Sequence, residues 1–175
     1  IMGIEAVKSS TPAPCRAKIK EALKVIMSKD EQSLIQFIDE FRNHFNKLSP
    51  EEIAYPRSVN GVIKYADTTN IYQKSTPIHT KGSLLYNHYL KENKLTYKYE
   101  TIKEGDKIKF IQLKEPNPIR EKVIAFPTKL PKEFNLHKYV DYESQFDKSF
   151  LEPLRFIVKA IGWNFEKQAT LDMFF

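Results

Sequence analysis

The apolar side chains between Asp30 and Leu48 recur every three or four residues, and this period constrains the fold more than any other feature of the sequence. Such spacing places them on one face of an α-helix. Asp30 stands where a side chain can cap the first free backbone N–H groups. The segment therefore predicts an amphipathic helix that begins after Asp30, with an apolar face made of Leu34, Phe37, Ile38, Phe41, Phe45 and Leu48.

Similar signals predict helices nearer the two ends of the chain. Ser9-Ser10-Thr11-Pro12 supplies hydroxyl caps and a proline for the first helical position, so we expect a helix at about 13–27. Ser49-Pro50-Glu51-Glu52 opens a short helical turn by the same logic. A last helix at about 141–161, ended by Gly162, is predicted from the spacing of Phe146, Phe150, Leu154, Ile157, Val158 and Ile161.

The middle of the chain has a different character. Strict alternation over 107–113 predicts a strand with one solvated face, and 123–126 predicts a second strand that Pro127 stops. A helix is expected at about 82–94. Pro56, Gly61 and Pro77 are residues that interrupt regular secondary structure. Between Pro56 and Pro77, four residues suggest extended structure: Val59, Val62, Ile63 and Tyr65. Together these elements predict an α+β fold, mainly helical, with a small β-sheet insertion.

Positive charge is concentrated in one part of the sequence. The chain has a net charge of +6, whereas residues 74–132 alone hold 13 Lys and Arg against 6 Asp and Glu. A concentrated basic stretch is typical of proteins that bind a polyanion such as nucleic acid, although a solvated lysine-rich surface has the same composition. No run approaches the 18 apolar residues of a membrane span, so no membrane partner is expected.

Residues for covalent chemistry are sparse. Two-metal catalysis needs converging carboxylates, but Tyr65-Ala66-Asp67-Thr68-Thr69 offers one acid only. Cys15 is the single cysteine, which fits a reducing compartment, and the four histidines lack metal-ligand spacing. No glycine-rich phosphate loop occurs. We therefore predict no catalytic residue, metal site or cofactor within the chain.

Four blocks of sequence resemble the C-terminal thumb region of family B DNA polymerases of the T-even phage and cyanophage type. They are Ile1-Met2-Gly3-Ile4-Glu5 with Ser9-Ser10-Thr11-Pro12 and Arg16; Pro77-Ile78-His79-Thr80-Lys81-Gly82; Asn117 to Pro127 with Leu130-Pro131-Lys132-Glu133; and Phe146-Asp147-Lys148-Ser149-Phe150 with Pro153-Leu154. The resemblance implies a thumb domain over 1–165. It also implies a phage protein in the cytoplasm of an infected bacterium, with catalytic aspartates and Mg²⁺ in an upstream palm.

The resemblance also implies where DNA would bind. Lysines at the positions of Lys122 and Lys148 contact the duplex backbone in relatives, whereas Glu152 stands where relatives can carry another lysine. Lys81 and Gly82, near a predicted helix N-terminus, form a candidate phosphate cradle. Two further candidates are Arg57 and His79, of which His79 could instead be a structural hydrogen-bonding group.

The last ten residues, 166–175, resemble a sliding-clamp-binding tail. Gln168, Leu171, Phe174 and Phe175 fit the spacing Gln-x-x-aliphatic-x-x-aromatic-aromatic. One helical turn would place the three apolar residues on one side as anchors for a hydrophobic groove. The alternative is that the terminal phenylalanines pack into this chain's own core.

The predicted function is therefore to hold primer–template duplex DNA without sequence preference, beside the palm and fingers, and to tether the polymerase to its sliding clamp. The chain should be inactive alone. One alternative is a free-standing DNA-binding accessory protein that interacts with the clamp. Another is a small enzyme with a site around Asp67 and His79.

Overall fold

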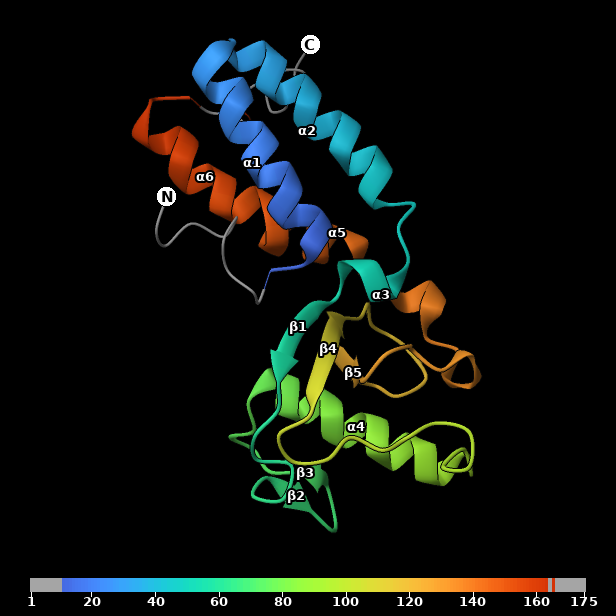
Figure 1. The fold of residues 1–175 in the computed structure, drawn as a ribbon. Coiled ribbons are helices and arrows are strands. Elements are labelled where there is room, and N and C mark those ends of the chain that lie inside the picture. The colour runs from blue at the N-terminus through green and yellow to red at the C-terminus, as the bar shows by residue number, and fades with distance from the viewer. Residues whose placement is uncertain (1–10, 164, 166–175) are drawn as a thin grey trace. The chain divides into compact units, whose positions relative to one another are not determined.

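The computed structural model of the chain describes residues 11–163 and 165 (Figure 1). The chain divides into two compact units, one made of Ile1–Leu48 with Tyr142–Phe175 and the other of Ser49–Asp141. Helices dominate and the sheets are small and antiparallel, so the predicted α+β class is confirmed. Within the described residues, no helix combines the length and apolar character that crossing a bilayer requires.

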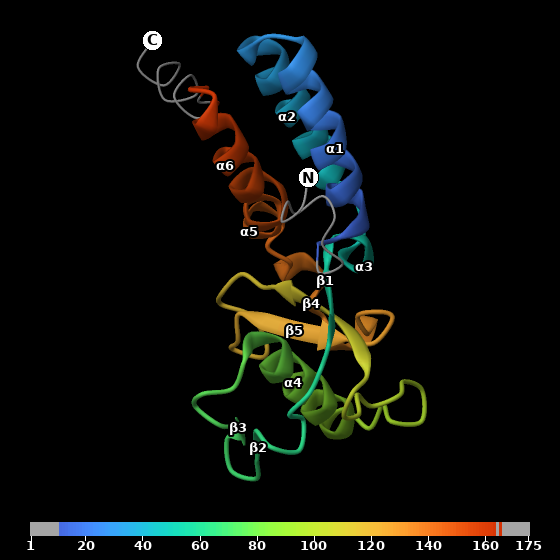
Figure 2. The ribbon, with the colours of Figure 1, turned by 60° about the vertical axis from the view of Figure 1, so that its left-hand side comes forward.

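The first unit is helical, and its helices begin and end close to the predicted residues. Asp30 caps α2 as expected, because its Oδ1 accepts the Ser33 N–H at 2.8 Å. In Figure 2, α1 lies beside α2 and beside the last helical segment. The bounds are α1 Ala13–Ser28, α2 Glu31–Phe45, α5 Tyr142–Phe146, a π-helical turn at Asp147–Leu151, and α6 Glu152–Ala160.

Aromatic rings from α2 and the last helical segment fill the core of this unit. The ring centroids of Phe41 and Phe150 lie 4.8 Å apart, and the rings meet edge to face, an arrangement that aromatic pairs favour. Phe45 and Phe146 meet in the same way at 5.2 Å. The apolar residues whose spacing predicted these helices are therefore also the residues through which the helices pack.

A π-helical turn interrupts the last helix just before Pro153. Proline has no N–H to donate to the carbonyl four residues earlier. The Glu152 N–H instead reaches back five residues to the Asp147 carbonyl, which is the π pattern. The single predicted helix is thus continuous in direction but carries one wider turn, and Lys148 lies in that turn.

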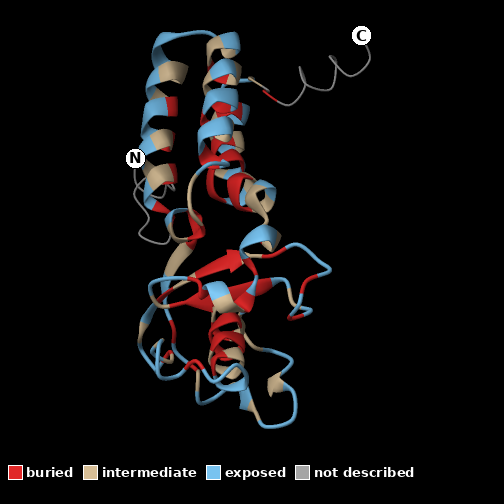
Figure 3. Cartoon of the chain, turned by 90° about the vertical axis from the view of Figure 1, so that its right-hand side faces the viewer, coloured by how far each residue is buried: buried red, intermediate tan, exposed pale blue. Residues whose placement is uncertain are grey.

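The second unit is a three-stranded antiparallel sheet with α4 against one face. The sheet order is β1-β4-β5, and every residue of β5 is buried (Figure 3). The Ser49 capping box that opens α3 is present. The bounds are α3 Pro50–Ile53, β1 Tyr55–Ser58, a small hairpin of β2 Ala66–Asp67 and β3 Ile71–Tyr72, α4 Ile78–Glu92, β4 Lys107–Gln112, β5 Val123–Phe126, and 3₁₀ turns η2 Lys132–Phe134 and η3 His137–Tyr139.

Two local predictions in this unit are wrong. The helix expected from Gly82 begins four residues earlier, at Ile78. The extended structure expected through Val62 to Tyr65 is a turn. Its cause is distant in sequence: one carboxylate oxygen of Glu104 accepts the N–H groups of Gly61 at 2.6 Å and of Val62 at 2.9 Å. Gly61 has φ +106°, a conformation that glycine adopts without steric cost.

Candidate nucleic-acid interface

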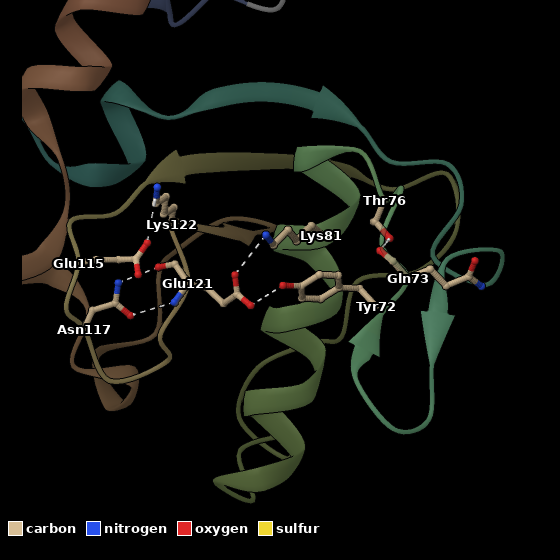
Figure 4. A network of polar contacts seen from close by, with 8 residues as sticks. All are labelled: Tyr72, Gln73, Thr76, Lys81, Glu115, Asn117, Glu121 and Lys122. Carbon is tan, nitrogen blue, oxygen red and sulfur yellow. Dashed lines mark hydrogen bonds and ion pairs between the residues drawn. The ribbon is translucent and has the colours of Figure 1, made fainter.

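Lys81, on the first turns of α4, lies in a small polar network (Figure 4). Its Nζ is 3.2 Å from Oε2 of Glu121, and Tyr72 donates its hydroxyl to Oε1 of the same carboxylate at 2.5 Å. The ammonium also lies 4.8 Å from the centroid of the Tyr72 ring, within cation–π range. The Lys81 and Glu121 side chains are only 28% and 21% exposed, so this ion pair is partly shielded from water.

The network keeps Lys81 charged and Tyr72 protonated. Burial by itself lowers the pKa of Lys81, but the hydrogen bonds with Tyr72 and Glu121 outweigh it and raise that pKa above 10.5. Burial, then the Glu121 carboxylate, raises the pKa of Tyr72 above 10.0. At neutral pH Lys81 is therefore a cation that already has an intramolecular counter-charge.

A loop held by Asn117 brings Glu121 to Lys81 and turns Lys122 outward. The buried Asn117 amide donates to the carbonyls of Lys114 at 2.8 Å and of Glu121 at 2.7 Å. Among the described residues, the acid nearest to Lys122 Nζ within ion-pair range is Glu115, at 4.0 Å, and the Lys122 side chain is 79% exposed. Lys122 is thus a cation of this loop that is available to a ligand (Figure 4).

Arg57 comes from β1 and His79 from α4, and the Arg57 charge acts on the His79 imidazole. Burial, then the nearby Arg57 charge, lowers the pKa of His79 below 6.5. At pH 7 the imidazole is therefore mostly neutral, and it can donate or accept a hydrogen bond without carrying charge. Arg57 itself is exposed. Of these two predicted residues, Arg57 is the charged one, and it is close enough for its charge to affect His79.

Gly82 is buried where α4 crosses β5 (Figure 2). A Cβ atom at Gly82 would lie 2.9 Å from the Ala125 backbone nitrogen and 3.1 Å from the Ile124 carbonyl carbon. Because the helix starts at Ile78, the Lys81 N–H is already donated to the Pro77 carbonyl at 2.8 Å. The predicted phosphate cradle assumed a helix that begins at Gly82, whereas the observed helix begins at Ile78. The close approach of the Ala125 backbone explains why a glycine stands at position 82.

The remaining predicted site residues lie in the other unit or outside the described residues. Lys148 is exposed in the π-helical turn, and Glu152 is exposed at the first position of α6. The residues of the predicted clamp-binding tail lie outside the described part of the chain: Gln168, Leu171, Phe174 and Phe175.

Asp67 has a structural task in the β2–β3 hairpin. Its Oδ1 accepts the N–H groups of Thr69 at 2.8 Å and Asn70 at 3.1 Å, the pattern of a side-chain-closed turn. The bonds to Asn70 and then Thr69 lower the pKa of Asp67 below 3.8. Over the described ranges, no group of three or more His, Cys, Asp or Glu side chains is placed to hold a metal ion.

The sequence assigned no individual role to three residues that build the site, although the last two lie in one of the blocks that resemble polymerases: Tyr72, Asn117 and Glu121. Tyr72 and Glu121 are 49 positions apart, and no periodicity links them. Asn117 carried a usable signal, since Asn-Pro favours a turn and an asparagine amide can satisfy several backbone groups at once.

Comparison with known proteins confirms the expected relationship to phage DNA polymerases. Over 179 residues the chain is 31% identical to the DNA-directed DNA polymerase of Enterobacteria phage T4, an alignment that covers 100% of the chain. Over 180 residues it is 35% identical to the DNA-directed DNA polymerase of Escherichia phage RB69, covering 99% of the chain. The chain spans 19% of the length of each of these relatives. No family model matches it.

Proposed function

We propose that this chain, a homologue of a segment of phage DNA-directed DNA polymerases, is the C-terminal thumb region of a family B enzyme and holds primer–template duplex through phosphate contacts. The observation that carries the proposal is the exposed Lys122 ammonium, presented by the Asn117 loop beside the shielded Lys81. Both lie within the basic stretch of residues 74–132. Lysine contacts to phosphate carry no base code, which suits an enzyme that must copy any sequence.

The two lysines would engage DNA differently. Lys122 is open to solvent and can meet a phosphate directly. Lys81 is paired with Glu121 at 3.2 Å, so a phosphate must compete with that carboxylate or share the ammonium with it. Lys148 is an exposed cation of the other unit and would add a separate contact. Arg57 would supply charge beside the neutral His79.

In the complete polymerase, we propose, the palm and fingers would supply nucleotide binding and the Mg²⁺ ions of catalysis. The enzyme would act in the cytoplasm of the infected bacterium. Gln168, Leu171, Phe174 and Phe175 would anchor it to a sliding clamp. The isolated chain is expected to bind DNA without polymerising it.

Salt-dependent binding tests the DNA proposal. Fluorescence anisotropy with a labelled duplex should show affinity that falls steeply with salt and is nearly independent of sequence. Each lost phosphate contact should flatten the log–log salt slope by about 1, so replacing all three lysines by Gln should flatten it by about 3. The three are Lys81, Lys122 and Lys148.

The matched control replaces three exposed lysines outside the candidate interface by Gln: Lys20, Lys24 and Lys91. This variant has the same net charge and should keep nearly the parental slope. Equal flattening in both triple variants would show that binding follows net charge alone, and would remove the assigned contacts.

Pull-down with the sliding clamp of a T4-like phage tests the tail. Phe174→Ala with Phe175→Ala should abolish clamp binding, whereas Met173→Ala should retain it, because Met173 is not an anchor of the predicted motif. Thermal unfolding of each variant distinguishes clamp binding from the alternative that the terminal phenylalanines pack into this chain's own core. A large loss of stability in the double variant would indicate that the two rings pack in this chain's own core.

A further inference from the structure

A pocket of about 280 Å³ lies between the 3₁₀ turns η2 and η3 of the second unit. Four side chains line it: Lys132, Asn135, His137 and Lys138. None of them belongs to the DNA-contact set proposed above. The pocket offers two ammonium groups, one imidazole and one carboxamide, which is a donor-rich lining suited to an anion.

The one acidic residue within 132–138 is occupied elsewhere. Glu133 Oε1 accepts the Tyr99 hydroxyl at 3.1 Å and lies 3.2 Å from Lys98 Nζ. Over the described residues, neither Lys132 nor Lys138 forms an ion pair with a carboxylate. The positive charge of the pocket is therefore not neutralised by the segment that builds it.

The backbone of the segment fixes the shape of the pocket. Asn135 ends η2 in the left-handed conformation, with φ 56° and ψ 37°. Its N–H is donated to the Lys132 carbonyl at 3.0 Å, and the Phe134 N–H to the Pro131 carbonyl at 3.2 Å, so these backbone donors fix the turn and any anion must be bound by the side chains. Asparagine tolerates this conformation better than most residues.

We infer that this pocket binds a phosphate group, carried either by a nucleotide or by a nucleic-acid backbone. Its volume is close to the lower end of small-ligand sites, roughly 300–1,000 Å³, so a phosphate with its sugar fits and a large cofactor does not. Lys132 and Lys138 supply the charge, and His137 supplies a directional hydrogen bond.

Amide NMR titration of the full 175-residue chain tests this site, with inorganic phosphate, dAMP and a short DNA duplex as separate probes, each at constant ionic strength. Saturable shifts should appear at residues 132–138 with phosphate and with dAMP. Lys132→Glu with Lys138→Glu should weaken binding at least tenfold, whereas Lys20→Glu with Lys24→Glu should leave it within twofold.

The titration with the DNA duplex shows which kind of molecule carries the phosphate. Saturation of the same amides by duplex below the midpoint for dAMP assigns the site to nucleic acid, and saturation by dAMP alone assigns it to a free nucleotide. If the lysine variant is misfolded, His137→Ala provides the test and should weaken phosphate binding while the charges remain. Shifts that stay linear in concentration, or that survive both variants, overturn the inference. Loss of duplex binding on removing Lys81, Lys122 and Lys148 is a separate readout, so either proposal can fail alone.

Discussion

Replacing Gly82 by Ala should destabilise the chain, although the residue lies inside α4. In a helix interior, alanine is more favourable than glycine by about 1 kcal/mol, so helix propensity alone predicts stabilisation. The structure predicts the opposite sign. The new Cβ would meet the Ala125 backbone nitrogen at 2.9 Å, and a strand backbone cannot rotate away as a side-chain tip can.

The size of the effect follows from how the contact must be relieved. α4 must move away from β5 by several tenths of an ångström, which loosens the buried contacts of Leu84, Leu85 and Tyr86. Overpacking of this kind costs about 1–3 kcal/mol. After the gain in helix propensity is set against it, we expect a net loss of up to about 2 kcal/mol, with about 1 kcal/mol as the central value.

Urea unfolding followed by circular dichroism measures this loss. For a denaturant slope of about 2 kcal/mol per molar, the central loss of about 1 kcal/mol should lower the midpoint by about 0.5 M. Lys91→Ala and Lys91→Gly provide the control, since Lys91 is exposed on the same helix and their difference reports propensity alone. If Gly82→Ala unfolds at or above the parental midpoint while the Lys91 pair differs by about 1 kcal/mol, the close-packing explanation is refuted.

Three further predictions concern titratable groups. Glu121→Gln should lower the free energy of unfolding by about 1 kcal/mol, because the ion pair with Lys81 is lost. It should strengthen duplex binding more than the control Glu100→Gln, an exposed position, because the Lys81 ammonium becomes free to bind phosphate. Equal duplex binding by the two variants would exclude competition between Glu121 and phosphate for Lys81. Burial raises the pKa of Cys15 to about 12, so iodoacetamide at pH 8 should alkylate it only after unfolding, and rapid labelling of the native chain would contradict its burial. The Asp67 carboxylate should titrate below pH 3.8 when followed through the NMR shift of the Thr69 amide, because hydrogen bonding favours the charged carboxylate. The stability that these bonds contribute is present above the pKa of Asp67 in the unfolded chain and is lost as the pH falls through its pKa in the folded chain. A titration midpoint at or above 3.8 would contradict this prediction.

The sequence by itself determined most of the local structure and the relationship to known polymerases. The helix after Asp30 and the strand from Lys107 were predictable because caps and periodicity act over a few residues. The same patterns named Phe41 and Phe150 as core residues, and motif order identified the relationship that comparison confirmed.

Only the tertiary structure decided how charged and tightly packed residues are used. A lysine-rich stretch does not reveal that Lys81 is paired with Glu121 while Lys122 is free to meet a ligand. Nor does it reveal that Gly82 faces a strand backbone, or that Glu104 fixes a turn more than 40 residues away. Periodicity reports which face of an element is buried. It carries no information on which distant side chain meets that face, and that pairing sets the charge, the pKa and the space available at each position.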